Sequence, residues 1–151
     1  MNNNDIGLKL SQINNLILRQ TLSTTADDRN NDYCGVSHAG SCIIAYLYDH
    51  SDKDVFQRDI EHEFLVRRST VSKVLTLLEQ KGYIDRVAVD YDHRLRKIVL
   101  TQKACNIVDK IKTDREILEK QITKNLSNEE IDKFRQTLQK IKSNLSQEES
   151  E

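Results

Sequence analysis

Residues 67–73 combine short hydroxyl side chains with fixed positive charge. The residues concerned are Arg67, Arg68, Ser69, Thr70, Ser72 and Lys73. Hydroxyl groups of this reach exchange hydrogen bonds with base edges, and the cations pair with phosphate oxygens. Presented from one helix, such a set fits the major groove of double-stranded DNA, which is about 12 Å wide. The competing interpretation is an ordinary amphipathic helix with a solvated polar face.

A second charged group follows in the polar segment 90–96, which lies between two apolar runs. It contains Arg94 and Arg96, and arginine on a narrow projecting loop suits the minor groove, whose negative potential attracts guanidinium groups. We expect Asp92 to hold the Arg94 guanidinium by a charge-assisted hydrogen bond. A surface loop with incidental charges is the alternative, but the preceding helix favours DNA binding.

The apolar pattern places the first group on the second of two helices. A short helix is expected at 57–64, and after a tight turn a longer helix is expected at 68–81. Its buried stripe consists of Val71, Val74, Leu75 and Leu78. Gly82 is placed to end this helix in the left-handed conformation.

The pattern then changes to a period of two, which predicts strands at 83–89 and 97–100 with a hairpin loop at 90–96. The resulting order of helix, turn, helix and hairpin is that of a winged helix-turn-helix.

Amphipathic helices are expected on both sides of this unit. One begins at Ile6 and ends before a polar loop at 24–32, and Ser37 is expected to cap the helix that follows. A long helix begins near Thr101, and Ser127-x-x-Glu130 has the form of a capping box that opens a last helix. The apolar stripes of the first helix and the last two need a partner.

Composition fits a helix-rich molecule whose core a second subunit partly completes. The 151 residues are 37% hydrophobic and carry a net charge of -1, yet residues 65–101 contain eight basic and four acidic side chains. A neutral chain can therefore still present a basic face to a polyanion. The longest apolar run, 42–48, is too short to cross a bilayer, and residues 1–5 do not resemble a secretion signal. We expect a cytoplasmic protein with no membrane contact.

Four ordered segments resemble the signature of MarR-type transcriptional regulators: 70–75 (TVSKVL), 78–86 (LEQKGYIDR), 92–94 (DHR) and 99–101 (VLT). The resemblance covers about residues 55–104, and the flanking helices match in layout only. It implies a mainly α fold with a small β-hairpin wing (α+β), a winged helix-turn-helix whose N- and C-terminal helices intertwine in a homodimer. It places Ser69, Thr70, Ser72 and Lys73 in the major groove and Arg94 in the minor groove, with Asp92 and Arg86 supporting the wing.

The resemblance also implies binding to pseudo-palindromic operators, with affinity lost when a small phenolic or lipophilic effector, an oxidant or a metal reaches the protein. The sequence departs from the family pattern at three positions. Phe56 stands where a Ser or Thr cap is common, Leu65 occupies a turn where Gly is frequent, and Ala104 replaces a common Gly. None of these changes removes a residue of the two charged groups.

Cys34, Cys42 and Tyr46 are the candidates for an effector or redox role. Cysteine as a small buried hydrophobe fits Cys42 and Cys105 better, and the oxidant-sensing branch of the fold carries its reactive cysteine in the first helix, where this chain has none. An effector pocket would lie between the dimer helices and the DNA-binding lobe. Tyr33 and Tyr48 are further candidates for its lining.

No pattern of residues indicates an enzyme, a cofactor or a metal site. The four histidines lack the spacing of zinc ligands, and the sequence contains no Gly-rich phosphate loop, nucleophile elbow or His-Glu-x-x-His segment.

We therefore expect a helix and loop at 1–36 that belong to the dimerisation region, a DNA-binding lobe at 37–101 and dimerisation helices at 102–151. The expected function is a homodimeric repressor that binds operator DNA and responds to a small molecule. The alternatives are a winged-helix protein-interaction module without an operator, a thiol- or metal-sensing variant of the regulator, and a thiol-dependent enzyme.

Overall fold

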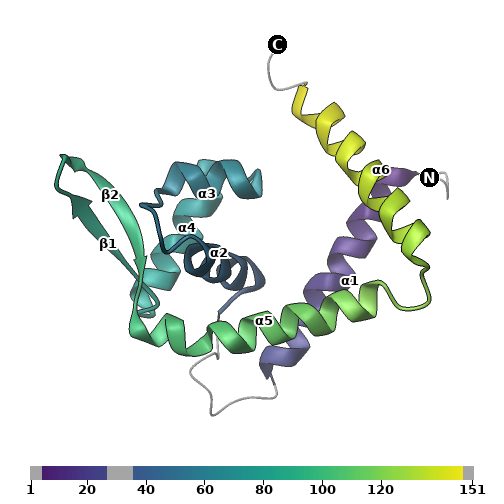
Figure 1. Ribbon diagram of the computed structural model, residues 1–151, viewed down its shortest axis with the longest axis horizontal. Helices are drawn as coiled ribbons and strands as arrows, with labels where there is room; N and C mark the ends of the chain where they lie inside the picture. The colour runs from purple at the N-terminus through teal and green to yellow at the C-terminus, as the bar shows by residue number, and fades with distance from the viewer. Residues whose placement is uncertain (1–4, 27–35, 148–151) are drawn as a thin grey trace. The chain divides into compact units, whose positions relative to one another are not determined.

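The computed structural model describes residues 5–26 and 36–147, and over these residues the chain forms helices and one antiparallel hairpin (Figure 1). The elements are α1 (Ile6–Ala26), α2 (His38–Asp49), α3 (Gln57–Phe64), α4 (Arg68–Gln80), β1 (Ile84–Val89), β2 (Asp92–Leu100), α5 (Gln102–Ile122) and α6 (Asn128–Gln147). The chain divides into two compact units, Met1–Arg115 and Glu116–Glu151. The mainly α class with a hairpin wing is confirmed. None of the helices in the described ranges is both long and apolar enough to cross a bilayer.

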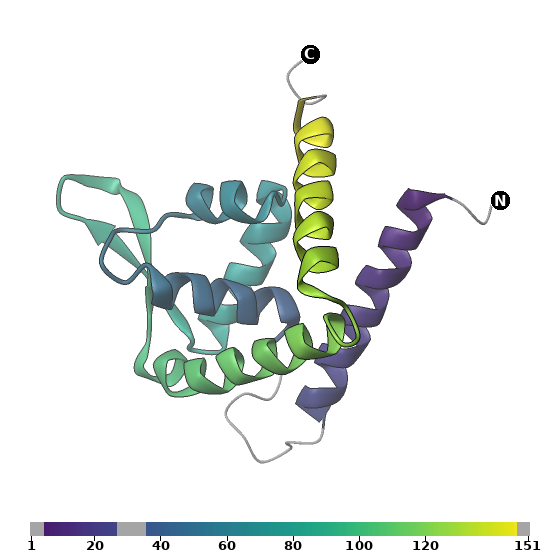
Figure 2. The same cartoon turned by 45° about the vertical axis from the view of Figure 1, so that its right-hand side comes forward.

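The core of the first unit joins α2, α3, α4, β1 and the first half of α5. Ile44, Ile60, Leu75 and Ile84 are completely buried and come from four different elements, and Val108 of α5 is 1% exposed. Because each element contributes at least one large apolar side chain, the position of α4 relative to the hairpin is fixed by packing. Figure 2 shows the hairpin projecting from the group formed by α2, α3 and α4.

The turn between α3 and α4 is built on a left-handed leucine. Leu65 follows α3 with φ 51° and ψ 42°. The turn therefore does require a positive φ at this position, where Gly is frequent in the family pattern. At the other end of α3, Phe56 supplies no capping oxygen, but its N–H donates to Asp59 Oδ2 at 2.8 Å. The helix boundaries 57–64 are as the sequence predicts.

The hairpin differs from the sequence prediction. Gly82 takes φ 75° after α4, as expected, but β2 begins at Asp92, and only residues 90–91 form the turn. Ala88 pairs with Arg96 while Val89 pairs with Asp92, so residues 93–95 form a bulge in β2. The predicted loop at 90–96 is therefore wrong. Its polar residues are exposed strand positions, which carry no apolar signal.

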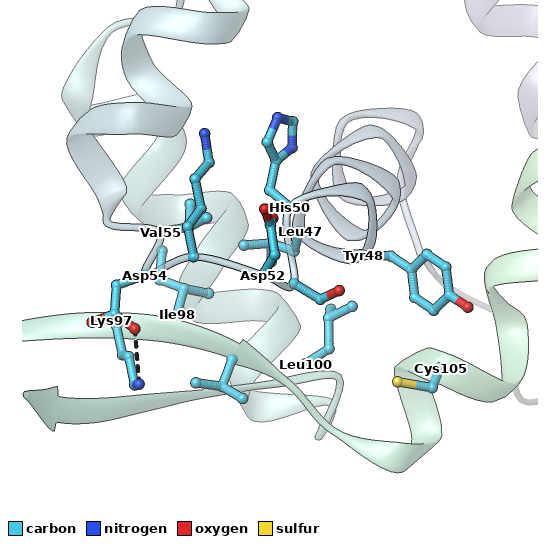
Figure 3. Close-up of a pocket in the computed structure, with 13 residues that line it drawn as sticks. Leu47, Tyr48, His50, Asp52, Asp54, Val55, Lys97, Ile98, Leu100 and Cys105 are labelled. Atoms are coloured by element: carbon cyan, nitrogen blue, oxygen red, sulfur yellow. Dashed lines mark hydrogen bonds and ion pairs between the residues drawn. The ribbon is translucent and has the colours of Figure 1, made fainter.

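The loop between α2 and α3 contacts the base of the hairpin through one backbone hydrogen bond and one ion pair. The Ile98 N–H donates to the Val55 carbonyl at 2.8 Å, and Lys97 Nζ lies 2.9 Å from Asp54 Oδ1 (Figure 3). These two bonds join the loop between α2 and α3 to β2.

The predicted caps are confirmed where they lie in the described residues. The Ser37 hydroxyl accepts from Gly40 N–H at 3.1 Å at the start of α2. Ser127 N–H donates to Glu130 Oε2 at 2.7 Å and Glu130 N–H donates to Ser127 Oγ at 3.2 Å. Residues 24–26 belong to α1 and not to the loop predicted at 24–32; the rest of that loop lies outside the described residues.

Candidate nucleic-acid interface

The N-terminal turn of α4 presents the first charged group to solvent. Arg67, Arg68, Ser69, Thr70 and Lys73 are exposed, and Ser72 is half-buried. On the opposite side of the helix, Val71, Leu75 and Leu78 are buried against the core. Arg67 occupies the N-cap position and forms no side-chain cap, so no side chain covers the first N–H groups of the helix. The structure thus brings together all six residues that the sequence assigned to the major groove.

The hairpin places Arg94 and Arg96 on β2, and both side chains are exposed. Asp92 does not act as predicted: its Oδ1 accepts from the backbone N–H of Arg94 at 2.9 Å, and no bond to the Arg94 guanidinium is formed. An aspartate two positions before a bulge residue reaches that backbone N–H first, as in an Asx-turn. Asp92 therefore orders the backbone of the bulge and leaves the Arg94 guanidinium free to bind.

Five arginines line a single hollow of about 440 Å³ between α3, the start of α4 and the hairpin. We call it the arginine hollow, and its cations are Arg58, Arg68, Arg86, Arg94 and Arg96. Arg58 was missed in the sequence, because an exposed arginine on a short helix gives no periodic signal. Arg86 and Arg96 belong to different strands of the hairpin, so the hollow depends on the β1–β2 pairing.

Few acidic groups offset this charge. The Nε atom of Arg86 lies 3.3 Å from Glu79 Oε2, at the end of α4. Even so, Nε and Nη2 of Arg86 are buried and form no hydrogen bond to any described residue. Glu61, the one carboxylate among the lining residues, accepts from Gln57 Nε2 at 2.9 Å. A buried guanidinium nitrogen without a hydrogen bond is costly, and an anionic oxygen is its best partner.

Comparison with known proteins shows which proteins the chain is similar to. The model of the MarR family matches residues 35–95, which include α2, α3, α4 and most of the hairpin. The chain is similar to the HTH-type transcriptional regulator PapX of Escherichia coli, with 22% identity over 112 residues, 74% of this chain and 68% of the relative. Both matches indicate similarity to the MarR family of transcriptional regulators.

Several solved structures share this architecture along nearly the whole chain. A complex of S. aureus MepR with DNA has a TM-score of 0.83 and 22% identity, covering 96% of this chain and 99% of the other. Streptococcus pneumoniae FabT in complex with DNA has a TM-score of 0.70 and 26% identity over 94% and 96%. MarR from Oenococcus oeni PSU-1 has a TM-score of 0.71 and 26% identity over 92% and 99%. The curated relative PapX and the Oenococcus oeni protein are transcriptional regulators and not enzymes.

The effector and redox candidates of the sequence lie only partly within the described residues. Cys34 and Tyr33 lie outside the described residues. Cys42 Sγ lies 3.8 Å from His38 Nε2, one helical turn away on α2. Burial raises the pKa of Cys42, and the nearby Arg115 cation offsets part of that rise. Burial lowers the pKa of His38, and the nearby Arg115 cation lowers it further. Both groups are therefore neutral near pH 7, which is unlike an activated thiolate.

Tyr46 packs into an aromatic group, with its ring centroid 4.2 Å from His50 and 5.7 Å from Phe64. Desolvation raises the pKa of Tyr46, and the negative charges of Glu63 and Asp59 raise it further. These contacts are those of a packing residue at the junction of α2 and α3. Among the described residues, no three histidine, cysteine or acidic side chains gather in a way that could hold a metal ion.

Proposed function

We propose that this chain is a MarR-type transcriptional regulator, a homodimeric repressor that binds a pseudo-palindromic operator and releases it when a small phenolic or lipophilic molecule binds. In each protomer, residues 37–101 are the DNA-binding lobe. The start of α4 enters the major groove and the hairpin enters the adjacent minor groove.

The arginine hollow is the observation that carries this proposal. Five guanidinium groups surround one space, and the buried Nη2 atom of Arg86 has no hydrogen-bond partner among the described residues. A phosphodiester supplies two anionic oxygens with the geometry that guanidinium groups bind best. Because the hollow lies between α4 and the hairpin, a backbone phosphate held there would sit between the two elements that enter the grooves.

The division of roles follows from exposure. Ser69, Thr70 and Lys73 are exposed on the first turns of α4 and, with Ser72, read base edges and phosphates. Arg94 enters the minor groove from a bulge whose backbone Asp92 orders. Two of the structurally similar proteins, MepR and FabT, were solved in complex with DNA, which supports the same use of the fold here.

Unburied apolar side chains on α1 and α6 support the dimer. Ile6 and Leu16 of α1 are 67% and 57% exposed, and Phe134 and Leu145 of α6 are 49% and 64% exposed. Stripes of this kind on long helices are covered by a second chain in stable proteins. We therefore assign α1, α6 and the end of α5 to the dimer interface. Sedimentation at micromolar concentration tests it, with a 17.5 kDa monomer as the contrary result.

Selection of bound sequences from random duplex DNA, followed by salt titration, tests the DNA-binding proposal. We expect a palindromic consensus with half-sites about 10–10.5 base pairs apart. Arg68→Ala should make the negative slope of log affinity against log salt shallower by about 0.9 per protomer, since one phosphate contact is lost. Arg94→Ala should weaken all duplexes alike, whereas Ser72→Ala should change the preferred sequence.

Lys53→Ala is the control, because Lys53 is an exposed cation in the loop between α2 and α3, outside the arginine hollow and outside the helices assigned to the dimer interface. If Arg94→Ala leaves affinity unchanged at moderate salt, the assignment of the hairpin to the minor groove is wrong. If no duplex binds at low salt, the proposal fails as a whole, and the protein-interaction module becomes the better interpretation.

A further inference from the structure

One apolar side chain lies on the exposed surface of α4, beside the residues proposed to contact DNA. The helix lies wholly within the described residues, and Leu77 is its one exposed apolar side chain, at 53%. Within the described part of the chain, Leu77 belongs neither to the buried core nor to the apolar side chains that pack against it. Its side chain is therefore available to a molecule outside the chain.

The position of Leu77 along α4 turns it toward the same groove as two of the proposed DNA contacts. Thr70, Lys73 and Leu77 are spaced three and four residues apart, so they lie on one side of the helix. At about 1.5 Å per residue, Leu77 lies about 6 Å beyond Lys73 along the helix axis. Successive base pairs are about 3.4 Å apart. A helix that follows the groove and brings Lys73 to the bases therefore brings Leu77 to the bases about two steps further along.

The charges of α4 do not keep DNA away from Leu77. Glu79 is the only carboxylate of the helix, and its Oε2 lies 3.3 Å from Nε of Arg86 on β1. Glu79 thus faces the hairpin, about 200° around the helix from Leu77. Lys73, about one turn before Leu77, is an exposed cation. The side of α4 that carries Leu77 is therefore basic and apolar, which fits a nucleic acid.

The chemistry of leucine selects one group among those that the major groove presents. Leucine has no hydrogen-bond donor or acceptor, and the C5-methyl group of thymine is the apolar group that the base pairs present there. Against another base, leucine would cover a nitrogen or oxygen without replacing the hydrogen bond to water that this atom loses. A leucine that reaches the base edges therefore favours thymine.

We propose that Leu77 contacts the C5-methyl group of one thymine in each half-site and so specifies thymine at that position. The inference rests on the proposed function, because α4 has to enter the major groove before Leu77 can reach a base.

Deoxyuridine tests the contact, since it pairs as thymine does and lacks only the C5-methyl group. In the duplex recovered by selection, each thymine of the half-site is replaced in turn, at both symmetric positions, and affinity is measured by fluorescence anisotropy. At one position the parent chain should bind about fifteenfold more weakly, or about fourfold per half-site, as expected when one buried methyl group is lost from each. Leu77→Ala should bind the two duplexes with affinities within about twofold of each other, because alanine does not reach the methyl group.

Two controls separate the contact from general effects on the protein. Alanine is the best helix former, so Leu77→Ala keeps α4 intact. Val99→Ala shortens a 38% exposed apolar side chain on β2, away from the proposed contact, and should keep the full penalty. Each variant is compared with itself on two duplexes, so a change in its overall affinity does not affect the ratio.

The inference is overturned, and the proposed function stands, if the operator is bound but no deoxyuridine substitution weakens binding, or if Leu77→Ala keeps the full penalty. It is also overturned if Leu77→Ala dissociates the dimer in sedimentation, because a second copy of the chain then covers this side chain. If no duplex binds at low salt, the proposed function fails and the inference fails with it.

Discussion

Replacing Leu65 by glycine and by alanine should show that the turn between α3 and α4 is strained. Leu65 has φ 51°, a region that costs a non-glycine residue about 1–2 kcal/mol. Its side chain is 58% exposed, so it recovers little by burial. Leu65→Ala keeps the backbone strain and loses that small burial, whereas Leu65→Gly removes the strain.

The magnitudes follow from these two quantities. Full burial of leucine is worth about 1.5–3 kcal/mol, so a side chain that is 58% exposed contributes about 0.6–1.3 kcal/mol. Leu65→Gly gains about 1–2 kcal/mol from the backbone and loses the burial plus about 0.5–1 kcal/mol of chain entropy. Leu65→Gly should therefore lie near the parent in stability and about 0.5–1 kcal/mol above Leu65→Ala.

Leu77 provides the matched control, because it is 53% exposed but lies within α4. There, glycine should be about 1 kcal/mol less stable than alanine. Urea unfolding followed by circular dichroism measures all four variants, at one protein concentration because a dimer's midpoint depends on it. The reasoning is refuted if the difference between glycine and alanine has the same sign at Leu65 and Leu77.

Three further outcomes are expected. Asp92→Ala should weaken duplex binding about two- to fivefold, because the Arg94 N–H loses its 2.9 Å acceptor, while Asp92→Asn keeps an acceptor and should bind normally in an anisotropy assay. The hydrogen bonds that Glu130 forms with Ser127 at the start of α6 lower the pKa of Glu130, so the stabilisation they give is present above the unfolded-state pKa and is lost as the pH falls through the lowered pKa. Glu130→Gln should abolish this acid dependence of amide exchange in α6, and an unchanged profile would contradict it. Burial raises the pKa of Cys42, so iodoacetamide should modify Cys42 several-fold more slowly than it modifies glutathione at pH 7.5. The rate at Cys42 should increase as the pH is raised above about 9. The measurement uses a chain whose other two cysteines are replaced by serine, and equal rates at pH 7.5 would favour the thiol-sensing alternative.

Features that depend on neighbours in the sequence were predictable. The Ser37 cap, the Ser127–Glu130 capping box and the left-handed Gly82 each follow from contacts within four residues. The boundaries of α3 were equally clear, because Ile60 sets the buried face of a helix that must end at a turn.

Features that depend on distant partners were not predictable. The length of β2 is set by pairing with β1, and its polar residues 93–96 gave no strand signal. The bond of Asp92 to the Arg94 backbone depends on the shape of the bulge. Arg58 joins the arginine hollow only because the fold brings α3 and the hairpin to the same hollow, although they are distant in the sequence.

The five permanently charged arginines that line the arginine hollow repel one another in the free protein. Doubly charged buffer anions such as sulfate and phosphate should therefore raise its melting temperature more than chloride at equal ionic strength, by settling among the guanidinium groups. The same anions would compete with the proposed operator, so affinities measured in phosphate buffer would be lower than those measured in chloride.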